Sequence, residues 1–219
     1  MDIDKKNLDS TGEQYTTWGL PFPRGREEPV SDKYDQDITV FGASGGASLY
    51  RTKMLKEIGL FDEDFFAYYE DVDISFRAQL AGWKIVYQPK AEVYHQIGAT
   101  SSRIKDFTTY QTLKNLPMLF WKNVPWALMP RMLPRFSLAY WGIFFSAVKR
   151  RQGMAAAQGM SAFLLLFPKK TFQRYSIRRN RVVSVRYIDS ILIHDLPPNA
   201  AKLHSLRSRW WKIRGKYPE

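Results

Sequence analysis

The sequence predicts an α/β domain over residues 1–115, followed by an α-helical, membrane-facing region over residues 116–219. In the first half, short β-branched and aromatic runs alternate with segments of helical period, which is typical of α/β proteins. The charge is unevenly divided, because residues 1–100 carry a net charge of −6 and residues 101–219 a net charge of +18. This asymmetry predicts two regions with different tasks.

The composition is that of a folded protein. Hydrophobic residues make up 45% and charged residues 25% of the 219 residues, enough for one core with an appendage. Cysteine is absent, which excludes a disulfide framework, a thiolate metal site and a cysteine nucleophile.

The first half is expected to contain short elements bounded by glycine and proline. Residues 1–37 show no sustained period and are expected to be loop and extended chain. After them, we expect strands over residues 38–41, 47–51, 83–88 and 91–95, and helices over residues 52–58 and 70–81.

The second expected helix has a clear apolar face. Val72, Phe76 and Leu80 recur every fourth residue and are predicted to share that face. Asp73 and Arg77 have the same spacing, so we expect them to pair on the helix surface.

Three features near this helix could carry chemistry. A glycine-rich loop, Gly42-Ala43-Ser44-Gly45-Gly46, would let backbone approach a ligand closely, although a tight turn explains it equally well. The acids Glu70 and Asp71 begin the helix, where the helix dipole favours their ionised form, and such acids also simply stabilise helices. His95 follows an expected strand and becomes a candidate metal ligand only where a metal site is near.

The second half alternates Lys/Arg clusters with aromatic, uncharged stretches at residues 136–148 and 152–168. Neither stretch reaches the roughly 20 apolar residues that a spanning helix needs. Aromatic side chains beside basic ones favour an anionic membrane surface as partner, and a helical subdomain with a solvated basic face is the alternative. Nucleic acid is not an expected partner, because no zinc-finger, RRM or KH signature is present.

Long strings of the first half resemble family 2 glycosyltransferases, and most closely the rhamnosyltransferase-type branch that builds bacterial surface polysaccharides. The resemblance is dense over residues 8–115 and looser in the tail. It is carried by Gly-Ala-Ser-Gly-Gly-Ala-Ser-Leu-Tyr-Arg (42–51), Glu-Ile-Gly-Leu-Phe-Asp-Glu-Asp-Phe-Phe-Ala-Tyr-Tyr-Glu-Asp-Val-Asp-Ile-Ser-Phe-Arg (57–77) and Ala-Gly-Trp-Lys-Ile-Val-Tyr-Gln-Pro-Lys-Ala-Glu-Val-Tyr-His (81–95).

The resemblance implies a Rossmann-like GT-A fold and inverting transfer of a sugar from a nucleotide-diphospho-sugar donor to a glycan or lipid-linked acceptor. It implies that Asp71 is the general base and that Glu70 positions the acceptor. Ser44, Gly45 and Gly46 would line the acceptor pocket. A divalent metal ion, magnesium or manganese, is the implied cofactor, and in some relatives a histidine at the position of His95 binds it.

The sequence departs from the family at its start. Family members carry a donor-binding half with an Asp-X-Asp metal motif before this region, and Asp2-Ile3-Asp4 matches that motif by letters only. We therefore expect the acceptor-side C-terminal half of such an enzyme, truncated, inactive alone and partnered by a separate donor-binding chain. We expect it peripherally at the cytoplasmic face of the cell membrane. The alternative is a non-catalytic membrane- or nucleic-acid-binding fragment.

Overall fold

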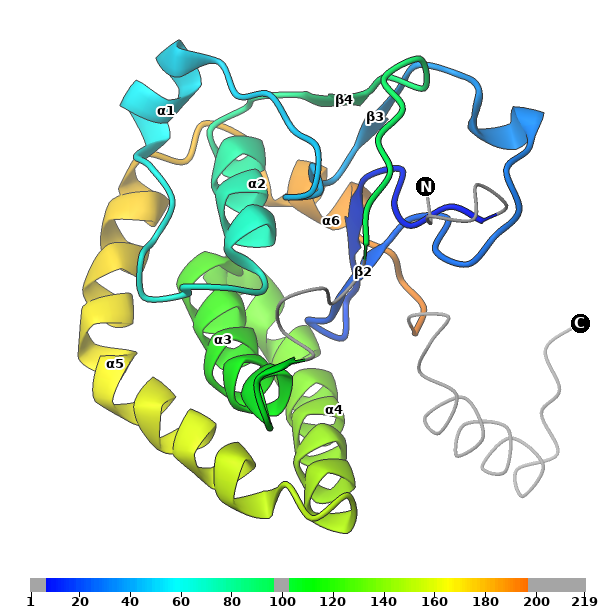
Figure 1. Ribbon diagram of the computed structural model, residues 1–219. Helices are drawn as coiled ribbons and strands as arrows, with labels where there is room; N and C mark the ends of the chain where they lie inside the picture. The colour runs from blue at the N-terminus through cyan, green and yellow to red at the C-terminus, as the bar shows by residue number, and fades with distance from the viewer. Residues whose placement is uncertain (1–6, 97–102, 197–219) are drawn as a thin grey trace, which may run out of the picture.

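The computed structural model describes residues 7–96 and 103–196, which form a mixed α/β structure (Figure 1). The Asp2-Ile3-Asp4 string and the last part of the basic tail lie outside these residues. In chain order the elements are β1 (Glu13–Tyr15), β2 (Pro21–Pro23), η1 (Asp32–Tyr34), β3 (Ile38–Val40), α1 (Thr52–Ile58), α2 (Glu70–Leu80), β4 (Ile85–Tyr87), α3 (Phe107–Asn123), η3 (Trp126–Leu128), α4 (Met129–Lys149), α5 (Gly153–Arg179) and α6 (Val185–Ser190).

The described strands form two antiparallel pairs, β1 with β2 and β3 with β4. Reciprocal backbone hydrogen bonds between Glu13 and Gly42, at 2.7 and 3.0 Å, link the two pairs. The β1–β2 hairpin was missed by the sequence prediction, because its three-residue strands are too short to show an alternating pattern. Gly19, with φ of +70°, lies in the turn between them and has the freedom that a left-handed conformation requires.

Two predicted strands are wrong. Residues 47–51 and 91–95 are irregular, although β3 and β4 confirm the strands predicted on either side of the first helices. Both irregular segments border a cavity and have no strand alongside. A β-favouring sequence forms a strand only where a partner satisfies its backbone groups.

Helices α1 and α2 confirm the prediction almost to the residue, and Gly59 ends α1 as expected. Val72, Phe76 and Leu80 lie together in the core. The predicted pair of Asp73 and Arg77 is present at 2.9 Å but is buried, not on the helix surface as predicted. Lys122 and Asn123 of α3 contact Asp73 and cover this face of α2. The sequence pattern of α2 alone could not show this contact.

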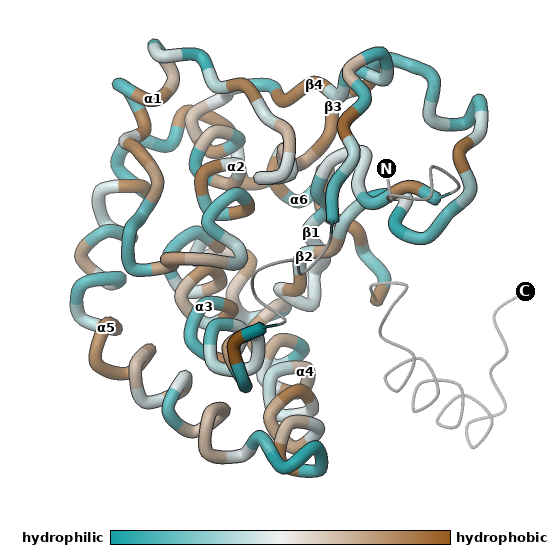
Figure 2. Tube along the Cα trace, in the orientation of Figure 1, coloured by the Kyte–Doolittle hydropathy of each residue, from teal (hydrophilic) through white to brown (hydrophobic). Residues whose placement is uncertain are grey.

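The second half is helical, as predicted, and α3 packs along the long helix α5 (Figure 1). Gly159 permits this close packing, since a Cβ there would lie 2.4 Å from the carbonyl oxygen of Tyr110. Hydrophilic and hydrophobic residues alternate along α5 (Figure 2). Among the helices in the described ranges, none has the length and apolarity needed to cross a membrane.

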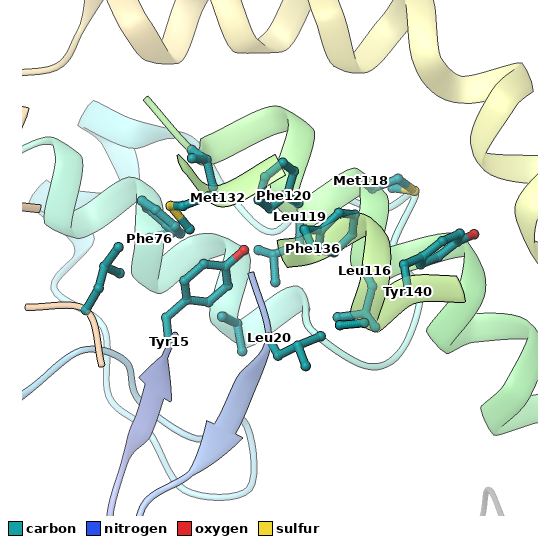
Figure 3. Packing of buried hydrophobic residues seen from close by; sticks show 14 of the residues in the cluster. Tyr15, Leu20, Phe76, Leu116, Met118, Leu119, Phe120, Met132, Phe136 and Tyr140 are labelled. Carbon is teal, nitrogen blue, oxygen red and sulfur yellow. The ribbon is translucent and has the colours of Figure 1, made fainter. Parts of the chain in front are cut away.

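One hydrophobic core joins both halves of the chain. Tyr15 from β1 and Phe76 from α2 lie next to Phe120 from α3 and Phe136 from α4, and Figure 3 shows these side chains converging. The domain boundary predicted after residue 115 falls inside α3, whose buried residues lie on both sides of it. The division into the acceptor-side part of a GT-A domain at residues 1–115 and a membrane-associating helical region at residues 116–219 stays a prediction.

Candidate active site

The glycine-rich loop is anchored to one face of α2. The Gln79 amide donates hydrogen bonds to the carbonyl oxygens of Val40 and Phe41, at 3.1 and 3.0 Å. One turn earlier, the Ser75 hydroxyl accepts a hydrogen bond from the backbone N–H of Ala43 at 3.2 Å. Since α2 is buried along nearly its whole length, these contacts place the loop in a fixed position beside the first turn of α2.

Asp71 is held at that first turn by backbone donors. Its Oδ2 accepts a hydrogen bond from the N–H of Gly45 at 2.7 Å, and its Oδ1 accepts one from the N–H of Val72 at 2.8 Å. Burial raises the pKa of the Asp71 carboxyl, and these hydrogen bonds partly oppose the shift. A Cβ at Gly45 would lie 3.2 Å from Oδ2, so this position favours glycine.

Glu70 lies beside Asp71, and one of its carboxylate oxygens lacks a hydrogen-bond partner. Its Oε2 is buried and has no hydrogen-bond partner within the protein. Burial, and to a smaller extent the neighbouring Asp71, raises the pKa of Glu70. A buried acceptor without a partner is available to a donor from a bound molecule, such as a sugar hydroxyl.

His95 lies on the other side of the glycine pair. Its Nδ1 is 2.7 Å from Oδ2 of Asp9, and Oδ1 of Asp9 accepts from Arg26 at 2.7 Å. A Cβ at Gly46 would lie 3.7 Å from the same Nδ1. The two glycines thus stand between the Asp71 carboxylate and the His95 imidazole.

A cavity of about 640 Å³ opens beside this loop and is lined by Ser44, Gly46 and His95 among others. Glu70, Asp71 and Gly45 are not among its lining residues. Asp71 is linked to the cavity through Gly45, whose two neighbours in the chain line the wall. The structure therefore places all six predicted site residues at or beside the glycine-rich loop. Ser44, Gly46 and His95 line the cavity, whereas Glu70 and Asp71 begin α2 and Gly45 contacts Asp71.

The segment before α2 is held in an unusual conformation. Phe66, Tyr68 and Tyr69 all have positive φ angles, of 61°, 68° and 71°, which cost free energy for non-glycine residues. The side-chain amide of the fully buried Asn115 donates to the carbonyl oxygens of Phe65, Ala67 and Tyr68 at 2.8 to 3.0 Å. Asn115 of α3 therefore fixes the approach to Glu70 and Asp71.

Two buried lysines hold the same segment from its far end. Lys170 of α5 contacts Asp62 and Asp64 at 2.6 and 2.7 Å, and Lys122 of α3 contacts Asp62 and Asp73 at 2.6 and 2.9 Å. Burial alone would raise the pKa of Asp62, but the two lysines outweigh it and hold that pKa far below its usual range. Asp62, Asp64 and Asp73 are thus paired with lysines of α3 and α5.

Glu13 is a titratable group near the site that the sequence did not point to. It is buried, and burial, followed by the charge of Asp71, raises its pKa to about 8. It lies in a segment without periodicity or motif, so its burial could not be read from the sequence. A protonated carboxyl here keeps a second negative charge away from Asp71.

Replacing Glu13 with glutamine should flatten the pH dependence of stability. Between pH 4.5 and about 8 the folded carboxyl stays protonated while the unfolded chain ionises. The unfolded state then binds fewer protons, so the free energy of unfolding falls as pH rises, by at most about 1.4 kcal/mol per pH unit. Urea unfolding of Glu13→Gln across this range should show a shallower decline.

The exposed Glu92 provides the control, because Glu92→Gln should retain the wild-type slope. A Glu13→Gln profile parallel to wild type would show that Glu13 titrates normally in the folded protein.

The predicted metal site is not complete in the described residues. No group of three or more His, Asp or Glu residues gathers there in a way that could hold a metal ion. His95 has one carboxylate beside it, Asp9, and a carboxylate on Nδ1 commonly orients a histidine whose Nε2 binds a metal. One imidazole alone does not make a stable site, so His95 as a metal ligand stays a prediction.

Comparison with known proteins agrees with this arrangement. The family model described as "Glycosyltransferase like family 2" matches residues 14–115, the segment that carries the whole glycine loop and α2. This segment therefore resembles glycosyltransferase family 2, in agreement with the predicted resemblance, and the chain is a transferase by resemblance.

Two similar proteins are both rhamnosyltransferases, the branch of the family that the sequence resembles. Two proteins of Mycobacterium tuberculosis, from strains CDC 1551 / Oshkosh and ATCC 25618 / H37Rv, are both N-acetylglucosaminyl-diphospho-decaprenol L-rhamnosyltransferase. Each is 43% identical over 86 residues, which cover 39% of this chain and 26% of the relative. The chain therefore spans about a quarter of the length of these relatives. No solved structure matches it.

Proposed function

We propose that this chain is the acceptor-side part of an inverting glycosyltransferase that takes a sugar from a nucleotide-diphospho-sugar. The observation that carries the proposal is the Asp71 carboxylate. It is held at 2.7 Å by the Gly45 N–H, beside a cavity large enough for a sugar unit, and burial raises its pKa. A carboxylate that is fixed in place and more basic than usual suits general-base catalysis.

The proposed reaction uses few protein groups. An acceptor hydroxyl donates a hydrogen bond to a free lone pair of Asp71, because each carboxylate oxygen already accepts only one backbone N–H. The hydroxyl oxygen attacks the anomeric carbon of the donor sugar, and its proton passes to Asp71. The bond to the nucleoside diphosphate breaks on the opposite side, which inverts the anomeric carbon. The unpaired Oε2 of Glu70 is available to orient the same acceptor.

The donor side of the proposal rests on the family. We expect the described elements to form part of a GT-A fold that takes a nucleotide-diphospho-sugar as donor. Magnesium or manganese is the expected counter-charge for the diphosphate, and His95 is the residue we expect to contribute a ligand.

The acceptor side rests on the named relatives, which act on N-acetylglucosaminyl-diphospho-decaprenol and transfer L-rhamnose. We propose a lipid-linked sugar diphosphate as acceptor here too, and a peripheral place at the cytoplasmic face of the membrane. Exposed aromatic and aliphatic side chains on α4 and α5, including Trp141, Phe145, Leu165 and Phe172, support that placement.

Acceptor binding tests the proposal without a donor. A short-chain N-acetylglucosaminyl-diphospho-prenol should bind this chain saturably in a calorimetric titration. Ser44→Trp, which fills the cavity from its wall, should weaken binding by about tenfold or more, since it blocks the site. Ser31→Trp is the control on the exposed side of η1. Equal affinity of the two variants would place the acceptor elsewhere.

A further inference from the structure

A second cavity, of about 220 Å³, lies where the ends of α2, α3 and α5 meet, away from the candidate active site. It contacts Leu80 at the last turn of α2, roughly 14 Å along the helix axis from Asp71 at the first turn. Its lining residues are Leu80, Lys122, Asn123, Val124, Pro125, Trp126, Ala127, Arg174, Ile177, Arg178, Arg181 and Val185.

Arg174 forms the buried wall of this cavity. Its guanidinium carbon lies over the rings of Trp121 and Trp126, 5.2 and 4.0 Å from their centres, and the residue is 4% exposed. It donates to the carbonyl oxygens of Trp121 and Val124, which end α3. Its Nε is buried without any partner in the protein. Burial, followed by the charge of Arg178, lowers its pKa to about 10.

No carboxylate balances this charge. The cavity lining contains Arg174, Arg178, Arg181 and Lys122 but no Asp or Glu. Asp73 is not in the cavity lining, and its carboxylate already accepts hydrogen bonds from Lys122, Asn123 and Arg77. Buried arginine is ordinarily paired with an anion, because its planar donors match carboxylate and phosphate oxygens. The cavity is therefore a concentration of unbalanced guanidinium groups with an apolar floor.

Exposed apolar side chains include Trp126 in the cavity lining and Tyr175 and Val182, each next in sequence to an arginine of the lining. Tyr175 and Val182 are 62% and 76% exposed, and Trp126, which stacks on Arg174, is 42% exposed. Apolar side chains around a basic pocket suit a ligand with a phosphate group at its head and hydrocarbon behind it. A free phosphate ion or a nucleic acid backbone offers no hydrocarbon to these residues.

We propose that the cavity formed by Arg174, Arg178 and Arg181 binds the phosphate of an anionic membrane lipid. Arg174 supplies the fixed charge inside, and Arg178 and Arg181 close on the phosphate from the rim. Trp126, Tyr175 and Val182 enter the interfacial layer next to it. This inference rests on the proposed membrane placement, not on sugar transfer, and it gives the basic tail a specific binding site in place of a diffuse charge.

Vesicle co-sedimentation with matched charge changes tests this site. The variant Arg178→Gln/Arg181→Gln removes two charges from the cavity, and Arg179→Gln/Arg186→Gln removes two exposed charges outside it, one at the end of α5 and one on α6. The control variant should bind phosphatidylglycerol vesicles more weakly than wild type only by the amount that two surface charges contribute. The cavity variant should bind about tenfold more weakly than the control, because charge-assisted contacts to phosphate are lost.

Equal losses in the two variants would overturn the proposal in favour of general surface attraction. Inorganic phosphate that competes with vesicles at micromolar concentration would identify a free phosphate site and overturn the lipid assignment, and so would an oligonucleotide that binds more tightly than the vesicles. Circular dichroism checks that both variants are folded. Both variants should bind the short-chain soluble acceptor equally well. If neither variant nor the wild-type chain binds this acceptor, the result counts against the proposed transferase and not against the lipid site.

Discussion

Replacing Asp71 with asparagine is expected to lower turnover by about 10²- to 10⁴-fold, the usual contribution of a general base. The amide has nearly the same shape as the carboxylate but cannot accept the acceptor's proton. One amide oxygen can still accept from Gly45 or Val72, so the loop should keep its position. The measurement is sugar transfer with donor and acceptor supplied.

Asp35→Asn is the matched control, since Asp35 is exposed at the end of η1 and away from the loop. It should leave turnover unchanged. Donor affinity should be equal in both variants, because Asp71 acts on the acceptor. Turnover of Asp71→Asn within about threefold of wild type would remove Asp71 as the base and move attention to Glu70.

Replacing Lys170 with methionine is expected to destabilise the protein by about 3 kcal/mol. Lys170 is fully buried and contacts Asp62, Asp64 and Gln173. Methionine fills a similar volume but leaves Asp62 and Asp64 with less of their counter-charge. Breaking a buried pair on one side is more costly than replacing the whole pair with apolar groups. Urea unfolding measures the loss.

Lys149→Met, at the exposed last turn of α4, should change the free energy of unfolding by less than about 0.5 kcal/mol. A loss below about 1 kcal/mol in Lys170→Met would mean that Lys122 and Lys169 already neutralise the two carboxylates.

The candidate active-site segment could be predicted from the sequence to a large extent. Helix α2 was predicted because Val72, Phe76 and Leu80 keep a strict helical spacing, and α1 because a glycine ends it. The glycine loop and the acids at residues 70 and 71 were predicted as one site, and the structure places Asp71 within hydrogen-bond distance of Gly45. Local sequence patterns were sufficient for these two helices, but not for residues 47–51 and 91–95, where the predicted strands are absent.

What could not be predicted depends on contacts between distant segments. The β1–β2 hairpin has three-residue strands, held partly by the bond between Glu13 and Gly42. The raised pKa of Glu13 follows from the same burial. Asn115 and Lys170 resemble ordinary helix-surface residues in the sequence, because nothing local indicates that they face a loop some fifty or a hundred positions earlier.

The passage of α3 through residue 115 has a consequence for protein engineering. A chimera that exchanged the glycosyltransferase segment between relatives at that position would divide α3 and separate Asn115 from Leu116, Met118 and Phe120 of the same buried helix. Such hybrids should misfold even when both parents are stable. A junction at Val124-Pro125 or at Arg151-Gln152, between helices, would keep α3 intact. Exchange of segments between relatives should therefore transfer α3 together with the glycine-rich loop as one unit.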